Sequence, residues 1–298
     1  MRGLLLFSLV VAASCSAFGQ GMLVSGNWLE QHLNDREVVI LHVGAQQDYD
    51  EGHIPGARLV QLSDISVTDD AGLRLQLPRT ELLREALGKV GVTDTSSVVV
   101  YHATPAVQSA TRVWFTLDYL GMSDRASLLD GGLALWKKEG RALSKEAVAG
   151  AGNGPTLRPR PIQVVSAEWM EQHLNDPSVL RLDARTPNFY SGADKGSATR
   201  AGHIPGAINT PYLSFFDTEG RLRSREELRS LLHVGSAPPE ALRVTYCHIG
   251  QQATVPYFVA RYLGLDVRLF DGSFQEWSSR EALPIETGGG ETGGGPAH

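Results

Sequence analysis

Cysteine is scarce in this chain, whose 298 residues include only Cys15 and Cys247. Cys15 lies in a leader-like first stretch, so a processed chain would keep Cys247 alone and could form no internal disulfide. Exported proteins commonly use paired cysteines as disulfides. An unpaired thiol in such a protein indicates that the sulfur itself is used, which directs attention to Cys247.

An excess of one charge and long apolar runs are also lacking. The chain has 27 Lys and Arg against 33 Asp and Glu, a net charge of −6, and this mildly acidic balance argues against nucleic acid as a partner. The apolar run from Leu4 to Ala13 is too short to cross a bilayer. We therefore expect no nucleic acid, no transmembrane segment in the mature chain, and a monomer.

The first 19 residues have the pattern of a secretory signal peptide. A short positive start, Met1-Arg2-Gly3, precedes the apolar run, and small residues follow it up to Gly19. We expect cleavage near Ala17 or Gly19 and an exported protein, periplasmic or secreted. Loss of Arg2 would change the net charge from −6 to −7. Lipidation at Cys15 is an alternative, although Ala12-Ala13-Ser14 lacks the leucine usual before such a site.

The rest of the chain contains an internal repeat. Three blocks return in the same order: Trp28 to Asp35 as Trp169 to Asp176, Gly52 to Ala57 as Gly202 to Ala207, and Asp130 to Trp136 as Asp271 to Trp277. Two copies about 145 residues apart indicate paired domains and not a solenoid. We expect domains at 20–146 and 162–287, a linker at 147–161, and a Gly-rich disordered tail at 288–298.

Each copy alternates short apolar segments with segments of helical periodicity. The expected strands are Val38–Val43, Val98–Tyr101, Ser127–Leu129, Val179–Asp183, Val244–Tyr246 and Val267–Phe270. The expected helices are Arg79–Leu87, Val107–Leu120, Arg225–Leu232 and Ala253–Leu263. This alternation predicts an α/β fold with a parallel sheet in each domain, flanked by helices on both faces. Ligands bind such sheets beyond the carboxyl ends of the strands.

Cys247 lies at one of those ends. It follows the apolar run Leu242 to Tyr246 and precedes a short loop and the expected helix from Ala253. The positive pole of that helix and unpaired N–H groups would favour the reactive thiolate. The functional interpretation is a nucleophile that forms a covalent intermediate. The alternative is a small buried apolar residue, a common role for free cysteine.

These motifs resemble those of the rhodanese family, specifically its two-domain sulfurtransferases. Tyr49-x-x-x-His53-Ile54-Pro55-Gly56-Ala57 resembles the N-terminal signature. The segment from Val267 to Trp277, with Phe270-Asp271-Gly272-Ser273-Phe274, resembles the C-terminal one. The resemblance implies tandem rhodanese-like domains of which the second is active, and His102 replaces the cysteine in the first. It also implies that Cys247 takes a sulfur from a donor as a persulfide and passes it to cyanide or a thiol, without a cofactor or metal.

The same resemblance suggests the residues that bind the donor. Arg185, in Asp183-Ala184-Arg185, would hold its anionic group, and an arginine fork suits a sulfonate or carboxylate; the alternative is a structural ion pair with Asp183 or Glu276. The loop residues His248, Ile249, Gly250, Gln251 and Gln252 would cradle the sulfur with inward N–H groups, and Gly250 would permit the tight path. His248 departs from the family patterns and leaves the donor open between thiosulfate and 3-mercaptopyruvate.

Other recurring residues have structural interpretations. His53 and His203 occur in both copies, so we expect backbone hydrogen bonds at turns and not metal binding. We expect Trp136 and Trp277 to anchor the two cores. The segment 191–200, an insertion in the second copy, could border the active site.

The leading interpretation is a sulfurtransferase that takes its sulfur from thiosulfate, and three other functions are alternatives to it. One is a 3-mercaptopyruvate sulfurtransferase, and another is a non-enzymatic persulfide carrier for a partner protein. The third, a cysteine phosphatase, is disfavoured because the loop reaches Gln251, Gln252 and Ala253 without the arginine that surrounds a phosphate.

Overall fold

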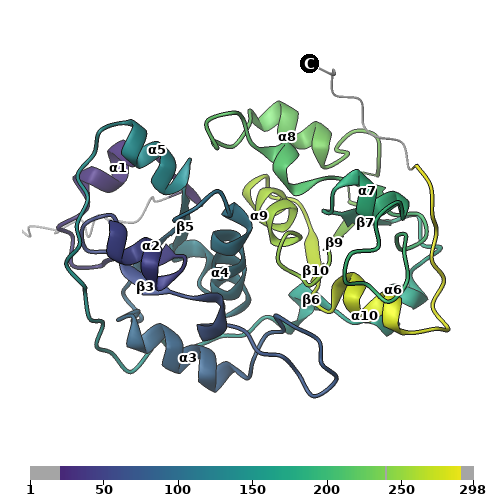
Figure 1. Ribbon diagram of the computed structural model, residues 1–298, viewed down its shortest axis with the longest axis horizontal. Coiled ribbons are helices and arrows are strands. Elements are labelled where there is room, and N and C mark those ends of the chain that lie inside the picture. Colours follow the sequence, from purple (N-terminus) through teal and green to yellow (C-terminus); the bar gives the residue numbers. More distant parts are fainter. Residues whose placement is uncertain (1–20, 239, 290–298) are drawn as a thin grey trace, which may run out of the picture.

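The computed structural model describes residues 21–238 and 240–289 and has two similar domains side by side (Figure 1). Each contains a five-stranded, all-parallel sheet, with strand order β1-β5-β4-β2-β3 in the first and β6-β10-β9-β7-β8 in the second. The expected α/β fold and the duplication are confirmed. The expected signal peptide, Cys15 and most of the tail lie outside the described residues.

The first domain contains the elements up to α5. They are β1 (Leu23–Val24), α1 (Gly26–Gln31), β2 (Val38–Val43), α2 (Gln46–Glu51), β3 (Arg58–Val60), η1 (Leu62–Asp64), α3 (Thr80–Lys89), β4 (Ser97–His102), α4 (Val107–Tyr119), η2 (Ser123–Arg125), β5 (Ala126–Leu129) and α5 (Gly132–Lys138).

The second domain repeats this order. Its elements are η3 (Pro161–Gln163), β6 (Val164–Val165), α6 (Ala167–Gln172), β7 (Val179–Asp183), α7 (Pro187–Ser191), β8 (Ile208–Asn209), η4 (Tyr212–Phe215), α8 (Arg225–Leu231), β9 (Leu242–Tyr246), α9 (Thr254–Tyr262), β10 (Val267–Phe270) and α10 (Ser273–Ser279).

The long apolar runs became the central strands because both faces of each sheet are covered. Val98, Val99, Val100 and Tyr101 of β4 have no exposed surface. Three expected strands, β2, β7 and β10, have the predicted bounds, and the expected helices agree with the structure to within two residues at each end. The short edge strands β1, β3, β6 and β8 have too few residues to show a pattern in the sequence.

Helices α4 and α9 pack against each other between the two sheets and form the centre of the domain interface (Figure 1). The Trp114 ring meets Phe258 edge to face at 4.8 Å, and Phe115 meets Tyr257 in the same way at 4.9 Å. Aromatic pairs of this geometry add to the free energy gained by burying their surface. One hydrophobic cluster therefore continues across both domains, and each domain has a further cluster of its own.

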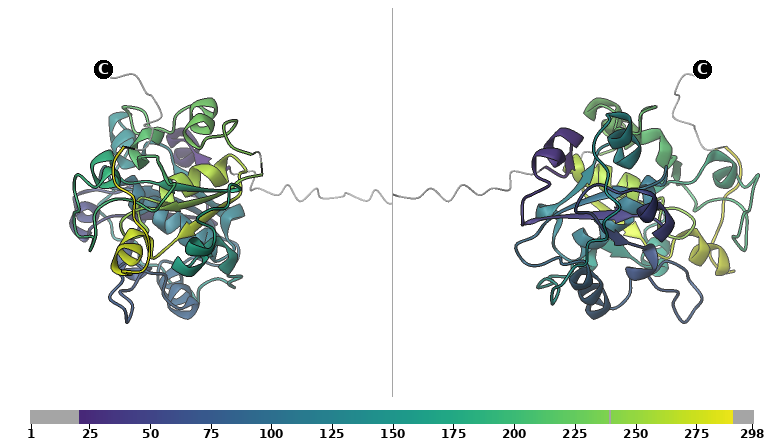
Figure 2. Two further views of the ribbon diagram at one scale, coloured as in Figure 1. Left: turned by 90° about the vertical axis from the view of Figure 1, so that its right-hand side faces the viewer. Right: turned by 60° about the vertical axis from the view of Figure 1, so that its left-hand side comes forward.

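Each domain also extends a loop to the other. The backbone N–H of Leu77 donates to Asp271 Oδ2 at 3.0 Å, and that of Leu222 donates to Asp130 Oδ1 at 2.9 Å. Asp130 and Asp271 are matched residues of the repeat, so the two contacts are equivalent. Figure 2 shows the two domains from the side, with helices on both faces of the sheets.

The linker lies against the first domain. The N–H of Arg158 donates to the Leu120 carbonyl at 3.0 Å, and that of Arg160 donates to the Tyr119 carbonyl at 2.7 Å. The end of the linker is therefore fixed to the first domain where α4 ends. In the described ranges 21–238 and 240–289, no helix has the length and apolarity needed to span a membrane.

Candidate active site

Cys247 follows β9 directly, at the carboxyl edge of the second sheet, where the sequence placed it. It is a free cysteine, and its side chain has no exposed surface. Strand β9 lies between β7 and β10, so the residues that follow those two strands surround it. Because the sulfur is buried, a donor can reach it only when the side chains above it move.

The residues after β10 hold the backbone of Cys247. Its N–H donates to Ser273 Oγ at 3.2 Å, and Ser273 Oγ donates to the Phe270 carbonyl at 2.9 Å. The Cys247 carbonyl accepts from the N–H of Phe274 at 2.9 Å. Ser273 has a left-handed backbone, with φ of 53°. Such a backbone is costly for a non-glycine residue, and here it places the hydroxyl beside the backbone of Cys247.

Arg185 follows β7 and is also buried, with 1 % of its surface exposed. It forms an ion pair with Asp183, with Nε at 2.9 Å from Oδ1 and Nη2 at 2.6 Å from Oδ2. Its guanidinium also lies 4.1 Å from the ring centre of Phe274. Burial lowers the pKa of Arg185, but the Asp183 charge and the nearby Cys247 act the other way, and the net shift is upward.

Two nitrogens of Arg185 are thus committed. Nε and Nη2 serve Asp183, and Nη2 also donates to the Gly202 carbonyl at 2.8 Å. The structural ion pair of the alternative interpretation is present, with Asp183 and not with Glu276. Among the described residues, Nη1 has no hydrogen-bond partner and is the nitrogen left for a donor. Donor binding by Arg185 stays a prediction.

His248 is partly buried and packs edge to face on Phe189 at 4.5 Å between ring centres. Burial, followed by the positive charge of Arg185, lowers the pKa of His248 to about 4. The ring is therefore neutral at pH 7 and offers a hydrogen bond and not a positive charge. A cationic donor-binding role for His248 does not fit this geometry.

The rest of the expected cradle follows in the loop 247–253. Gly250 has φ of 80°, which favours glycine. Gln251 Nε2 donates to Ser109 Oγ of the first domain at 2.9 Å, and Gln252 Oε1 is buried without a partner among the described residues. Ile249 is partly exposed. Helix α9 begins after this loop, so its positive end faces the site. Stabilisation of a sulfur anion by these N–H groups stays a prediction.

Two functional candidates were missed by the sequence analysis. Arg74, in the loop between β3 and α3, reaches across from the first domain: its N–H donates to Gln275 Oε1 at 3.1 Å, and its charge acts on His248. Tyr212 in η4 lies near Cys247 and Gln252, and burial raises its pKa. Neither residue lies near the cysteine motif in sequence, so no local pattern could have linked them to it.

The segment 191–200 does border the site. Ser197 Oγ lies 3.4 Å from Arg74 Nη2, and the charge of Asp194 acts on His248. Arg200 fixes the end of the segment by donating to carbonyls that follow α10, among them Arg280 at 2.7 Å.

The matching edge of the first domain has lost these groups. Tyr101 and Tyr246 are equivalent, since their hydroxyls accept from the N–H of Ile54 and of Ile204. His102 therefore stands where Cys247 does. The strand register pairs His42 with Tyr101 and Asp183 with Tyr246, so Gly44 occupies the position of Arg185. The described structure thus has one cysteine-bearing edge and one equivalent edge without the sulfur or the arginine.

The expected structural residues have the predicted roles. His53 Nδ1 lies 2.8 Å from the Tyr49 carbonyl, and His203 Nδ1 lies 2.7 Å from that of Tyr190. Trp136 and Trp277 are buried, with 1 % and 0 % of their surface exposed.

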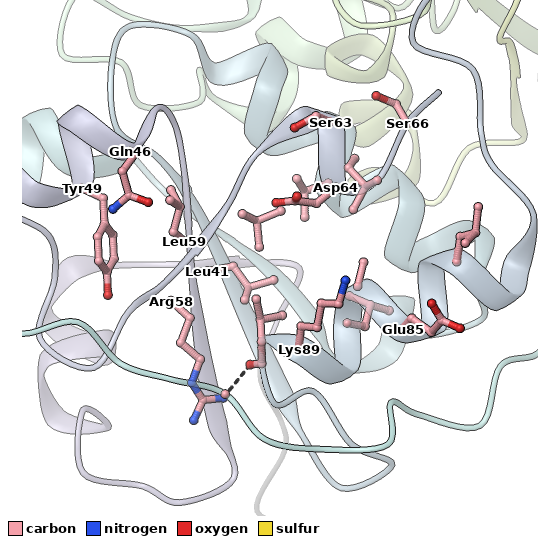
Figure 3. Close-up of a pocket in the computed structure, with 18 of the residues that line it drawn as sticks. Leu41, Gln46, Tyr49, Arg58, Leu59, Ser63, Asp64, Ser66, Glu85 and Lys89 are labelled. Atoms are coloured by element: carbon pink, nitrogen blue, oxygen red, sulfur yellow. Dashed lines mark hydrogen bonds between the residues drawn. The ribbon is translucent and has the colours of Figure 1, made fainter. Parts of the chain in front are cut away.

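A cavity of about 620 Å³ lies away from Cys247, in the first domain (Figure 3). Arg58 of β3, Asp64 of η1 and Glu85 and Lys89 of α3 line it, and Arg58 Nη1 donates to the Val90 carbonyl at 2.8 Å. No site residue expected from the sequence lines this cavity.

Comparison with known proteins finds the same family in both halves of the chain. The model of the Rhodanese-like domain matches residues 25–139 and 166–280. A thiosulfate sulfurtransferase of Azotobacter vinelandii is 31% identical over 87% of this chain and 94% of its own length. The sulfur carrier protein TtuD of Thermus thermophilus is 31% identical over 90% and 97%. A 3-mercaptopyruvate sulfurtransferase of Escherichia coli is 29% identical over 88% and 97%.

Solved structures share the fold at lower identity. Wild-type EanB has a TM-score of 0.79 and 22% identity, over 90% of this chain and 70% of its own. The anaerobic ergothioneine biosynthesis enzyme of Chlorobium limicola has a TM-score of 0.80 and 22% identity, over 90% and 71%. With a rhodanese-like domain in each half and relatives that match it nearly end to end, this chain belongs to the rhodanese family of two-domain sulfurtransferases.

Proposed function

We propose that this protein is an enzyme that moves the outer sulfur of thiosulfate to a thiophilic acceptor through a Cys247 persulfide. The observation that supports it most directly is the position of Cys247. It is a free thiol at the carboxyl end of a central strand, beside the N-terminus of α9 and near Arg185. Such a place suits an anionic sulfur and a donor with a negative group.

The reaction has two steps. The Cys247 thiolate attacks the outer sulfur of thiosulfate, the S–S bond of the donor breaks, and sulfite leaves with the electron pair. Cyanide or a thiolate then attacks the outer sulfur of the persulfide, and the Cys247–S bond breaks to restore the thiolate. No external oxidant or reductant is consumed. Both substrates address one sulfur atom, so the donor remnant must leave first, which requires ping-pong kinetics.

Two arginines close to the cysteine loop favour an anionic donor. Arg185 is buried with one nitrogen available, and Arg74 is exposed on the loop from the other domain. We propose that Nη1 of Arg185 donates a hydrogen bond to the anionic group of the donor. Arg74 and the neutral ring of His248 would lie on either side of that group. Thiosulfate and 3-mercaptopyruvate both carry such a group, so this charge suits either of them. A steady-state comparison of the two donors with cyanide as acceptor identifies the one that the protein uses.

Replacement of the nucleophile tests the mechanism. We expect Cys247→Ser to abolish sulfur transfer while the protein stays folded. Intact-mass analysis after thiosulfate treatment should show one added sulfur on the wild type and none on the variant. Sulfur transfer above background by the variant would exclude the covalent mechanism.

A persulfide carrier is the second candidate, favoured by the complete burial of Cys247 and by the relative named as a sulfur carrier. A carrier would load in the same way but release sulfur slowly to small acceptors. We expect an enzyme to turn over with cyanide at about 1 s⁻¹ or faster, the low end for ordinary enzymes. Parallel double-reciprocal lines with much slower turnover would favour the carrier, and intersecting lines would exclude the two-step mechanism.

We also propose that the protein is exported, because residues 1–19 have the signal-peptide pattern. N-terminal sequencing of the protein from the exported fraction would find a start near residue 18 or 20. A lipid-modified Cys15 would instead appear as a mass increase on the first residue.

A further inference from the structure

A buried arginine of the first domain contacts the loop that carries Cys247. Arg112 lies on α4 and has no exposed surface. Its Nη1 donates to the Gly250 carbonyl at 3.1 Å and to Asp271 Oδ1 at 2.5 Å, and its Nη2 donates to the Leu75 carbonyl at 2.7 Å. One guanidinium thus joins α4, the loop 61–78, the end of β10 and the cysteine loop. The mechanism above does not use it.

The contact with Gly250 fixes the orientation of a peptide group. In a planar trans peptide, the carbonyl of one residue and the N–H of the next point in opposite directions. Since the Gly250 carbonyl faces the Arg112 guanidinium, the N–H of Gln251 points away from that guanidinium. The left-handed backbone of Gly250 permits this turn. The nearby charge also polarises that peptide, which strengthens its N–H as a donor.

The pseudo-symmetry of the interface reveals a difference at the position of this arginine. Thr111 of α4 and Thr254 of α9 meet at 2.8 Å between their Oγ1 atoms, at matched places in the two copies. The residue after Thr111 is Arg112, and the residue after Thr254 is Val255. The arginine of α4 contacts the loop that carries Cys247, and the matching position of α9 holds an apolar valine that can donate no such hydrogen bond.

We propose that Arg112 is a positioning residue for sulfur transfer, supplied by the domain that lacks the cysteine, and that it holds the cradle of Cys247 in its reactive form. This proposal rests on the proposed function. Arg112 touches neither donor nor acceptor, so its loss should slow chemistry at the sulfur and leave donor affinity nearly unchanged. The cysteine-free domain would then be part of the active site and not only a support for it.

The test compares Arg112→Met and Arg112→Lys with the control Arg261→Met. Arg261 on α9 also forms an ion pair across the interface, with Asp118 on α4 at 3.0 Å, but contacts no residue of the cysteine loop. Alkylation of Cys247 by iodoacetamide at pH 7, followed by peptide mass analysis, measures the reactivity of the thiol without any sulfur donor. Steady-state kinetics with thiosulfate then separates kcat from KM.

We expect Arg112→Met to lower both the alkylation rate and kcat at least about tenfold, with KM changed less than about threefold. Arg112→Lys should recover part of the loss, because it keeps the charge but cannot reach all three acceptors. Arg261→Met should lower stability alone. Wild-type rates of alkylation and turnover in folded Arg112 variants would overturn the proposal. If Arg112→Met does not fold, the test rests on Arg112→Lys. Wild-type alkylation rate and kcat in that variant would then contradict the proposal. A wild type that alkylates quickly but transfers no sulfur would refute the proposed function instead.

Discussion

Among single residues, Arg185 has a structural role in the observed ion pair with Asp183 and a proposed role in binding the donor. Two of its nitrogens neutralise a carboxylate that has no exposed surface, and its flat face packs on Phe274. Removing one partner of a buried pair leaves an uncompensated charge, at a typical cost of about 3–5 kcal/mol. A substitution at Arg185 therefore affects stability whether or not it binds the donor, and activity alone cannot identify its role.

A matched pair of lysine substitutions separates the two effects. Arg181 lies on β7, the strand that Arg185 follows, is 9 % exposed and donates to carbonyls such as that of Pro205 at 3.1 Å. We expect Arg185→Lys and Arg181→Lys both to lower the free energy of unfolding. Only Arg185→Lys should raise KM for thiosulfate, by about ten- to a hundredfold for the loss of a charge-assisted hydrogen bond. Equal KM values in the two variants would assign Arg185 to structure alone.

At the scale of elements, the loop 247–253 gains its shape from contacts outside itself. Ser273 and Phe274 hold its first residue from the β10–α10 junction, and Ser109 and Arg112 hold its middle from α4. Loops generally move more than the elements they connect, but a reactive group must be held in a defined geometry. The contacts from two domains supply that restraint.

Gly250→Ala tests how closely the loop is fitted. A Cβ at this position would lie 2.6 Å from the Asp271 carbonyl oxygen and 2.8 Å from its Oδ1, so the loop must shift. Gly264→Ala is the control, because Gly264 has a similar φ of 75° but open space around it. In both variants the free energy of unfolding should fall by about 1 kcal/mol, because alanine is less stable than glycine in a left-handed backbone. Only Gly250→Ala should also lose most of its kcat, and full activity in that variant would show that the loop tolerates displacement.

At the scale of the whole molecule, duplication has produced two domains that depend on each other. The core is continuous through α4 and α9, and a loop of each domain donates a hydrogen bond to an aspartate of the other.

The first domain has a buried histidine, His42, at the position where the second domain has Asp183. His42 has no exposed surface and its Nδ1 lies 2.8 Å from the Tyr101 hydroxyl. Burial, followed by the proximity of His53, lowers the pKa of His42 to about 4.

This shift predicts a loss of stability on acidification. The folded-state pKa of about 4 is below the value of about 6.5 expected for an unfolded chain. Between these values the unfolded state binds more protons, so the free energy of unfolding falls as the pH drops from 6.5 to 4. The contribution of His42 is at most about 3 kcal/mol over that range. Urea unfolding at pH 7.5 and pH 5 should show a smaller difference in His42→Gln than in the wild type, and an equal difference would contradict the assignment.

The duplication, the central strands and the position of Cys247 could be predicted from the sequence alone. Period and apolarity are local properties, and a cysteine after an apolar strand must lie at the carboxyl edge of a parallel sheet. The tertiary structure was needed to show that Arg185 is paired with Asp183 and that His248 is neutral. It was also needed to show that, from the other domain, Arg74 contacts Gln275 and Arg112 contacts Gly250. The states of Arg185 and His248 depend on burial. The contacts of Arg74 and Arg112 join residues over a hundred positions apart, which lie together because the two domains pack on each other.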